Sequence, residues 1–247
     1  MFPVLAFHSP VLAHRGAMDS APENTLAALY AAREQGALWA EVDVKITQDG
    51  VPILMHDDTL DRTTNGSGLV ADASWEKVQT LDAGSWFDAR YAGERVPHLD
   101  DVMRVALETE LRLAIELKPC PGRARATTMV VLIEMAKKWP EGTEPPLISS
   151  FDVESLEIAA QLQPPWPRCF IMPDWRDDWR EIVEKVGASA VSMDEKALTE
   201  ERVAAFRSVE MPLLAYTLTD PARAKELLGW GVSAVYADRP RAILAHL

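Results

Sequence analysis

Cysteine is scarce in this sequence. Only two cysteines, Cys120 and Cys169, occur among 247 residues, and they do not form a CxxC pair. Thiolate zinc sites need closely spaced cysteines, and disulfide frameworks need several of them. Neither kind of site is therefore expected, and we interpret both cysteines as inert core thiols.

Positive charge is also in short supply. The 25 Lys and Arg residues face 38 Asp and Glu residues, which gives a formal net charge of −13. Such a surface repels the phosphate backbone of nucleic acid and the anionic face of a membrane. We therefore expect no nucleic-acid partner and no stable membrane association, while the pattern indicates no particular oligomeric state. A small phosphate ligand would need a local cluster of cations, or a metal, acting against this field.

Long hydrophobic runs are missing. The first apolar run, within residues 1–13, contains no Lys or Arg and is too short for the core of a signal peptide. No later segment approaches the roughly 20 apolar residues of a membrane span. The expected location is the cytoplasm. Hydrophobic residues still make up 48% of the chain, enough for a sizeable core.

Short apolar runs recur along the chain and alternate with segments of helical periodicity, which is typical of βα units around a parallel sheet. Strands are predicted at 11–14, 39–45, 112–118, 146–150, 167–172, 188–193, 212–217 and 233–237. Helices are predicted at 22–36, 100–110, 123–139, 152–162, 175–187, 199–209, 220–231 and 239–247. Eight of each in alternation predict a (β/α)8 TIM barrel. A doubly wound open sheet is the alternative, but its first turn would be rich in glycine, and "HRGAMDSAPEN" has only Gly16.

One irregular region, at about 47–98, separates the second strand from its helix. The dipeptide Asp49-Gly50 is a strong turn signal, so a short hairpin or an extra strand is expected there. Inserted βα loops of this kind lie at the active end of a barrel. No repeat and no domain linker is evident, so we predict a single TIM-barrel domain over 1–247 that includes this insertion.

Three carboxylates are predicted to face one space. In "WAEVDVKI" the period of two places Glu41 and Asp43 on one face, with valines on the face that suits helix packing. The same count in "RLAIELKP" turns Glu116 inward. Unpaired carboxylates repel unless a cation sits among them, and oxygen ligands without cysteine favour Mg2+ or Ca2+. Taken singly, each acid could instead pair with Lys45 or Lys118.

Two of the five histidines close predicted strands. His14 ends the first strand and is followed by Arg15, while His56 ends "VPILMH" at the edge of the insertion. Imidazole titrates near neutral pH, so two histidines beside a metal can form a general acid and a general base. Taken alone, a histidine at either position is more often an ordinary hydrogen-bonded residue than a catalytic one.

The sequence contains "HRG" at 14–16, "PENT" at 22–25, "EVDVKITQDGVPILMHDDTLDRTTNGSG" at 41–68 and "IELK" at 115–118. These motifs carry a resemblance to the glycerophosphodiester phosphodiesterase family of the cytoplasmic bacterial type. It continues more weakly through "ISSFD", "AYTLTD" and "ADRP" in the second half. It implies a (β/α)8 barrel with an insertion after strand two. It also implies metal-dependent hydrolysis of a glycerophosphodiester, such as glycerophosphocholine or glycerophosphoethanolamine, to an alcohol and sn-glycerol 3-phosphate.

The resemblance also implies residue roles: His14 and His56 as the acid-base pair, Arg15 and Lys118 as phosphate contacts, and Glu41, Asp43 and Glu116 as ligands of one divalent cation, Mg2+ or Ca2+. Two positions depart from the family pattern. Tyr216 stands where a tryptophan is usual, and "ADRP" replaces the commoner "TDRP". We expect Phe151 and Tyr216 to form the apolar wall of the glycerol or leaving-group pocket, with plain barrel packing as the alternative.

Two other functions fit the same barrel. A phospholipase acting on membrane lipids would need an apolar or basic rim that faces the membrane, and the negative net charge of the chain argues against such a rim. A catalytically silent phosphodiester sensor would be expected to have lost a histidine or a carboxylate, and all are present.

Overall fold

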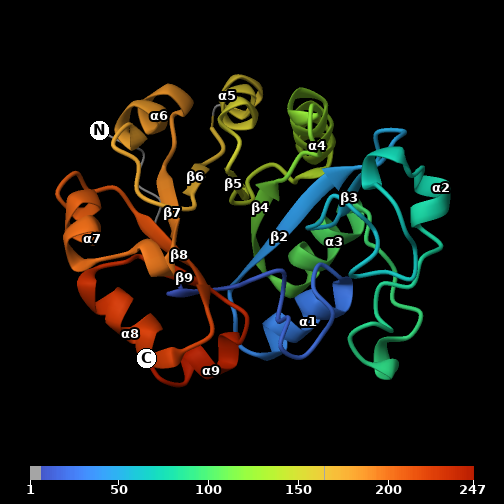
Figure 1. Cartoon of the computed structure of the whole chain (residues 1–247), viewed down its shortest axis with the longest axis horizontal. Helices are drawn as coiled ribbons and strands as arrows, with labels where there is room; N and C mark the ends of the chain where they lie inside the picture. Colours follow the sequence, from blue (N-terminus) through green and yellow to red (C-terminus); the bar gives the residue numbers. More distant parts are fainter. Residues whose placement is uncertain (1–6, 164) are drawn as a thin grey trace.

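Eight parallel strands form a closed barrel in the computed structural model, which describes residues 7–163 and 165–247 (Figure 1). The first six residues of the N-terminal apolar run discussed above lie outside the described residues. Closure is visible in the pairing of β1, which forms parallel bridges both to β2 and to β9. The parallel strands are β1 (Val11–Ala13), β2 (Trp39–Ile46), β4 (Arg112–Leu117), β5 (Leu147–Ser150), β6 (Arg168–Met172), β7 (Ala190–Asp194), β8 (Leu213–Leu218) and β9 (Ala234–Ala237). The TIM-barrel prediction is confirmed, and the open-sheet alternative is excluded by this closure.

Helices separate the strands and surround them on the outside (Figure 1). They are α1 (Leu26–Glu34), α3 (Leu99–Thr109), α4 (Ala124–Lys138), α5 (Val153–Leu162), α6 (Trp179–Val186), α7 (Glu200–Arg207), α8 (Pro221–Trp230) and α9 (Pro240–Leu244). Seven of these eight fall within their predicted ranges, and α3 begins one residue earlier than predicted, at Leu99. Within the described ranges, no helix has the length and apolar character needed to cross a membrane.

The helix predicted from residue 22 begins four residues later than expected. Thr25 is its N-cap, with a side-chain oxygen that accepts from the backbone N–H of Ala28. Asn24, just before the cap, has a positive φ of 56°, which an asparagine tolerates better than most residues. Glu23 and Asn24 therefore precede the helix, and both of their side chains are buried.

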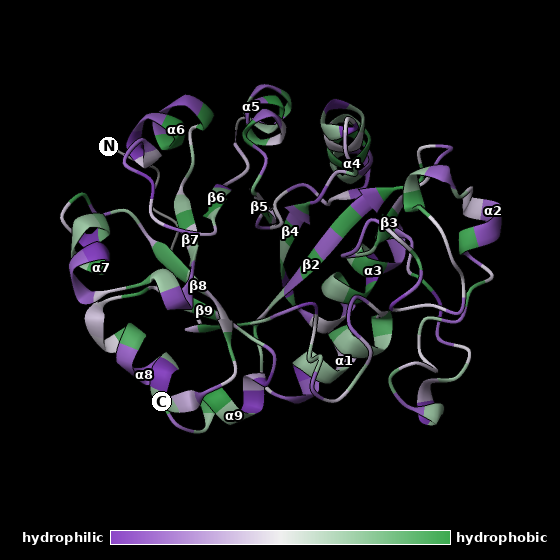
Figure 2. Ribbon diagram, in the orientation of Figure 1, coloured by the Kyte–Doolittle hydropathy of each residue, from purple (hydrophilic) through white to green (hydrophobic). Residues whose placement is uncertain are grey.

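The strands pack on both faces, and β2 shows the alternation directly. Figure 2 shows its ribbon banded between hydrophobic and hydrophilic residues. Val42 and Val44 lie in the same apolar cluster as Val102 of α3 and Val131 of α4. Trp39 instead joins a layer inside the barrel with residues from the other strands, including Cys169 and Tyr236. Burial of each large apolar side chain contributes about 1.5–3 kcal/mol to stability.

The predicted insertion folds as a small lobe beside β2. It contains β3 (Pro52–Leu54), two 3₁₀ helices (Val70–Asp72 and Ala89–Tyr91) and α2 (Trp75–Val78). Strand β3 pairs antiparallel with β2, as the turn signal at 49–50 predicts, and Gly50 there has a φ of +83°. The backbone N–H of Met55 donates to the carbonyl of Asp43, 3.0 Å away. This hairpin therefore places the next residue, His56, beside the carboxyl-terminal part of β2.

Candidate active site

Glu41, Asp43 and Glu116 come together at the carboxyl end of the barrel. Glu41 and Asp43 belong to β2, and Asp43 lies directly opposite Glu116 of the adjacent strand β4. One carboxylate oxygen from each residue lies within 4.8 Å of the others, and all three side chains are buried. The inward direction predicted from the period of two is therefore the direction that the structure shows.

The pKa values of the three acids are shifted in different directions because their surroundings differ. Burial and the charge of Asp43 raise the pKa of Glu41 above its usual range, and the same two causes raise the pKa of Glu116 to about 7. Burial also opposes ionisation of Asp43, but Arg15 and other cations hold its pKa below the usual value. Oxygen Oε1 of Glu41 is buried without a hydrogen-bond partner in the described ranges. A buried set of oxygen donors with one orphaned member fits a hard divalent cation.

Arg15 reaches the acidic cluster from the turn after β1. Its Nε lies 3.3 Å from Oδ2 of Asp43, and its backbone N–H donates to Oε2 of Glu41 at 3.0 Å. The turn is tight: Arg15 has a φ of +54° and Gly16 a φ of +81°. A Cβ on Gly16 would meet the backbone of Ala28 at 2.7 Å, so the glycine lets this turn lie against α1.

Lys118 follows β4 and faces the same cluster. Its Nζ lies 3.0 Å from Oε1 of Glu116 and 3.9 Å from Oδ1 of Asp43. Lys45, the other lysine considered as an ion-pair partner, instead donates to Asp58 and to the carbonyl of Lys118. Of the two lysines, therefore, Lys118 is the one whose charge bears directly on the acids.

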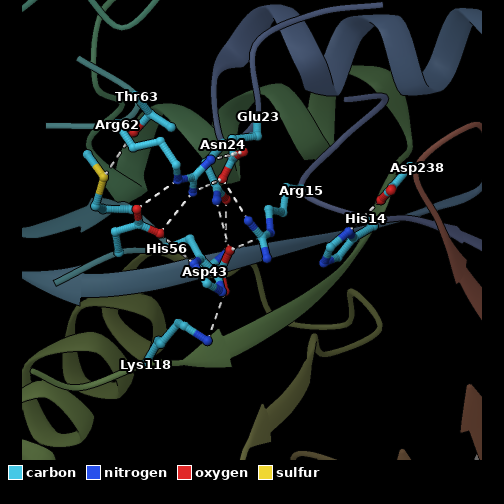
Figure 3. A network of polar contacts seen from close by, with 12 residues as sticks. His14, Arg15, Glu23, Asn24, Asp43, His56, Arg62, Thr63, Lys118 and Asp238 are labelled. Carbon is cyan, nitrogen blue, oxygen red and sulfur yellow. Dashed lines mark hydrogen bonds and ion pairs between the residues drawn. The ribbon is translucent and has the colours of Figure 1, made fainter. Parts of the chain in front are cut away.

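Each of the two candidate histidines has its own carboxylate. Nδ1 of His14 lies 2.7 Å from Oδ1 of Asp238, and Nδ1 of His56 lies 2.8 Å from Oδ1 of Asp57. Burial, the largest of several causes, lowers the pKa of His56. Both histidines line a cavity of about 340 Å³, together with Arg15, Glu41, Glu116 and Lys118. Figure 3 shows His56 and Lys118 near Asp43, with the pair of His14 and Asp238 on the other side of Arg15.

The cavity continues over the ends of β5 to β8, where its lining is partly aromatic. Phe151 and Tyr216 meet edge to face with ring centroids 5.8 Å apart. Nζ of Lys118 lies 5.4 Å from the centroid of Phe151, and the Tyr216 hydroxyl donates to the carbonyl of Met172. Both aromatics line the cavity, and Tyr216 also packs against the apolar layer inside the barrel.

Residue-level sequence reasoning missed several supporting side chains. Asn24 both donates to the Asp43 carboxylate and accepts from the Asp43 backbone N–H, at 2.8 and 3.0 Å. The others are Glu23, Asp57, Arg62 and Asp238, which hold Arg15 and the histidines. All five lie in the quoted motifs "PENT", "HDDTLDRTTNG" and "ADRP", so the signal was present although their contacts were not foreseen.

A buried acidic cluster, two cations and two carboxylate-paired histidines lie together at the carboxyl mouth of a TIM barrel, where enzymes of this fold carry their active sites. Comparison with known proteins gives the family. The pattern of the glycerophosphoryl diester phosphodiesterase family matches residues 14–242, and the chain belongs to this family of enzymes that hydrolyse glycerophosphodiesters.

Several relatives cover nearly the whole chain. A glycerophosphodiester phosphodiesterase of Bacillus subtilis is 34% identical over 93% of this chain and 83% of its own. The structure of an Oleispira antarctica phosphodiesterase in complex with the product sn-glycerol-3-phosphate is 34% identical, covers 96% of each chain and superimposes with a TM-score of 0.94. A glycerophosphodiester phosphodiesterase from Agrobacterium tumefaciens is 30% identical over 96% of this chain and 99% of its own, with a TM-score of 0.76.

Proposed function

We propose that this chain converts glycerophosphodiesters, such as glycerophosphocholine or glycerophosphoethanolamine, into an alcohol and sn-glycerol 3-phosphate. In this proposal Glu41, Asp43 and Glu116 hold one divalent cation, Mg2+ or Ca2+. The observation that carries the proposal is that Glu41 and Glu116 of this buried triad line the same cavity as both histidines. The product bound to the Oleispira relative has the same chemistry as the proposed product. The cytoplasmic location stays a prediction.

Charge compensation is the first requirement of the reaction, because a phosphodiester is already anionic and resists attack. Arg15 and Lys118 approach the acidic cluster from two strands and present their cationic groups to the cavity. We assign both to the nonbridging oxygens of the phosphate. A divalent cation on the three carboxylates, when bound, would supply further positive charge at the same place.

Proton handling falls to the two histidines. An Nδ1–H that donates to Asp238 or to Asp57 fixes the tautomer of each ring and leaves Nε2 for the substrate. One Nε2 accepts the proton of the nucleophile, which is either water or the 2-hydroxyl of the substrate's glycerol. Attack by the 2-hydroxyl gives a transient cyclic phosphate, which water then opens to sn-glycerol 3-phosphate. The other imidazole, protonated, donates its proton to the alkoxide oxygen that departs when the P–O bond breaks.

The aromatic part of the cavity is assigned to the organic arms of the substrate. Phe151 is 40% exposed although it lies at the mouth of the barrel, so its ring is available for contact. We propose that Phe151 and Tyr216 form the apolar wall against which the glycerol or the leaving alcohol lies. This contact would affect substrate affinity more than the chemical step.

The test is direct measurement of released sn-glycerol 3-phosphate. The purified chain is incubated with glycerophosphocholine, glycerophosphoethanolamine or glycerophosphoglycerol and with Mg2+ or Ca2+, and the product is read with a coupled dehydrogenase. We expect release that EDTA stops and excess cation restores, and that Glu116→Gln abolishes. Binding without turnover would favour the sensor, and cleavage confined to lysophospholipid vesicles would favour the phospholipase. Either result would overturn the proposal.

A further inference from the structure

Arg62, in the insertion, bridges two carboxylates that belong to different parts of the site (Figure 3). Its guanidinium donates through Nη1 and Nη2 to Glu23, at 2.7 and 2.8 Å. It also donates through Nε and Nη2 to Asp57, at 2.7 and 2.9 Å. A planar fork that serves two carboxylates at once is a geometry that arginine provides and lysine does not.

The two carboxylates contact different residues of the site. Oδ1 of Asp57 lies 2.8 Å from Nδ1 of the His56 ring, and Oε1 of Glu23 accepts a hydrogen bond from Nη1 of Arg15 at 2.7 Å. An unbroken series of ion pairs and hydrogen bonds thus runs from His56 to Arg15 by way of Arg62. The series joins a proposed acid-base group to a proposed phosphate contact, although Arg62 itself is not among the residues that line the cavity.

Both carboxylates depend on Arg62 for their position. In the described part of the chain, His56 and Arg62 are the side chains that hydrogen-bond to Asp57, so the loss of Arg62 would leave Asp57 held only by the ring it orients. Glu23 is 5% exposed and shares its charge between two arginines. Without Arg62, it would keep Arg15 alone and lose the contact that fixes its second oxygen.

We propose that Arg62 is a positioning residue with two separable effects, an inference that rests on the proposed function. Through Asp57 it fixes the tautomer and direction of the His56 ring, which governs kcat. Through Glu23 it fixes the guanidinium of Arg15, which governs substrate binding and therefore KM. Arg62 thereby couples the folding of the insertion to the assembly of the site.

The test separates these effects with single variants and one double variant, all assayed on glycerophosphocholine. We expect Asp57→Asn to lower kcat with little change in KM, and Glu23→Gln to raise KM with a smaller change in kcat. Arg62→Gln should do both, with a loss in kcat/KM of about 10²-fold, the scale of a misplaced catalytic group. Adding Asp57→Asn to Arg62→Gln should lower kcat no further, because both act through His56. Compared with Arg62→Gln, Arg62→Lys should recover part of the loss in either kcat or KM but not in both, because lysine cannot serve both carboxylates at once.

Arg104→Gln is the matched control. Arg104 also pairs with two carboxylates, Asp101 and Glu108, but on the exposed face of α3. We expect this variant to keep the kcat and KM of the parent chain. Circular dichroism and thermal melts identify any variant that fails to fold.

A spectroscopic measurement on the same variants needs no turnover. Nitrogen-15 spectra of the five histidines should show His56 as the Nδ1–H tautomer in the parent chain and a mixture of tautomers in Arg62→Gln. An unchanged His56 tautomer together with unchanged kcat and KM would overturn the inference. Absence of turnover by the parent chain would overturn the proposed function instead, and the tautomer measurement would still decide the role of Arg62 toward His56.

Discussion

Nδ1 of His14 lies 2.7 Å from Oδ1 of Asp238, although 224 positions separate the two residues in the sequence. His14 follows β1 and Asp238 follows β9, and these strands pair with each other where the barrel closes. His56, by contrast, takes its carboxylate from the next residue, Asp57. Closure of the barrel is therefore what completes one of the two histidine-carboxylate pairs.

Asp238→Asn is expected to lower kcat by about 10²- to 10⁴-fold, the contribution of one acid-base group. An asparagine amide can donate as well as accept, so it no longer selects the Nδ1–H tautomer of His14. Steady-state kinetics on glycerophosphocholine measure the effect. Asp220→Asn, an equal charge change at the exposed N-cap of α8, should be silent because asparagine caps as well as aspartate. A kcat for Asp238→Asn within twofold of the parent would contradict the assignment.

His14→Ala and His56→Ala should each remove most activity and leave the fold and cation binding in place. The expected loss is about 10²- to 10⁴-fold in kcat, because neither histidine belongs to the acidic cluster. Turnover and calorimetric cation binding are measured on the same preparations. His246→Ala, near the exposed C-terminus, should behave like the parent chain. Near-full activity of His56→Ala would show that its proposed role is wrong.

The acidic cluster could be predicted from sequence because strand periodicity fixes side-chain direction. Once Val42 and Val44 face the helices, Glu41 and Asp43 must face the interior. The register between β2 and β4 then brings Glu116 opposite Asp43. The order and approximate positions of the strands and helices can be predicted for the same reason, since hydrophobic periodicity is a local signal that the closed barrel reinforces.

The supporting contacts could not be predicted in this way. Arg62 lies in an irregular loop with no period, so nothing local says that its guanidinium reaches Glu23, 39 positions earlier. Glu23 and Asn24 look like the start of a helix because acidic and amide residues commonly begin helices. The structure turns both side chains toward the site instead, and Asn24 achieves this with a positive φ.

Glu41→Gln and Asp43→Asn should change the stability of the cation-free chain in opposite directions. Burial raises the pKa of Glu41, so its charge is unfavourable, and a glutamine amide there can donate to the neighbouring carboxylates. Asp43 is stabilised as an anion by Arg15 and Asn24, and its neutralisation leaves a partly buried arginine short of a partner. In EDTA we expect Glu41→Gln to raise Tm by about 2–4 °C, which corresponds to roughly 1 kcal/mol in a chain of this size. Asp43→Asn should lower it, and a lower Tm for both would contradict this account.

Cation affinity should depend on pH through Glu116. Its pKa is raised by burial and by Asp43 to about 7, above the ordinary value of 4.5, so the folded chain holds a proton that a cation must displace. The protonated form adds stability to the cation-free chain below about pH 4.5, and this stability is lost as the pH rises to about 7. Between these values the Kd for Mg2+ or Ca2+ should tighten by about tenfold per pH unit for each proton displaced, and level off above neutrality.

Calorimetric titrations from pH 5 to pH 8, in buffers of different ionisation enthalpy, measure both the Kd and the number of protons released. Thermal melts with and without the cation should show the stabilisation by the cation growing over the same range, because the cation offsets the repulsion that ionisation of Glu116 creates. Glu116→Gln keeps the size of the side chain and removes both the titrating group and a proposed ligand, so its Kd should be weaker throughout and should vary less with pH. A Kd that does not change between pH 5 and pH 7 would show that the cation binds without displacing a proton from this cluster.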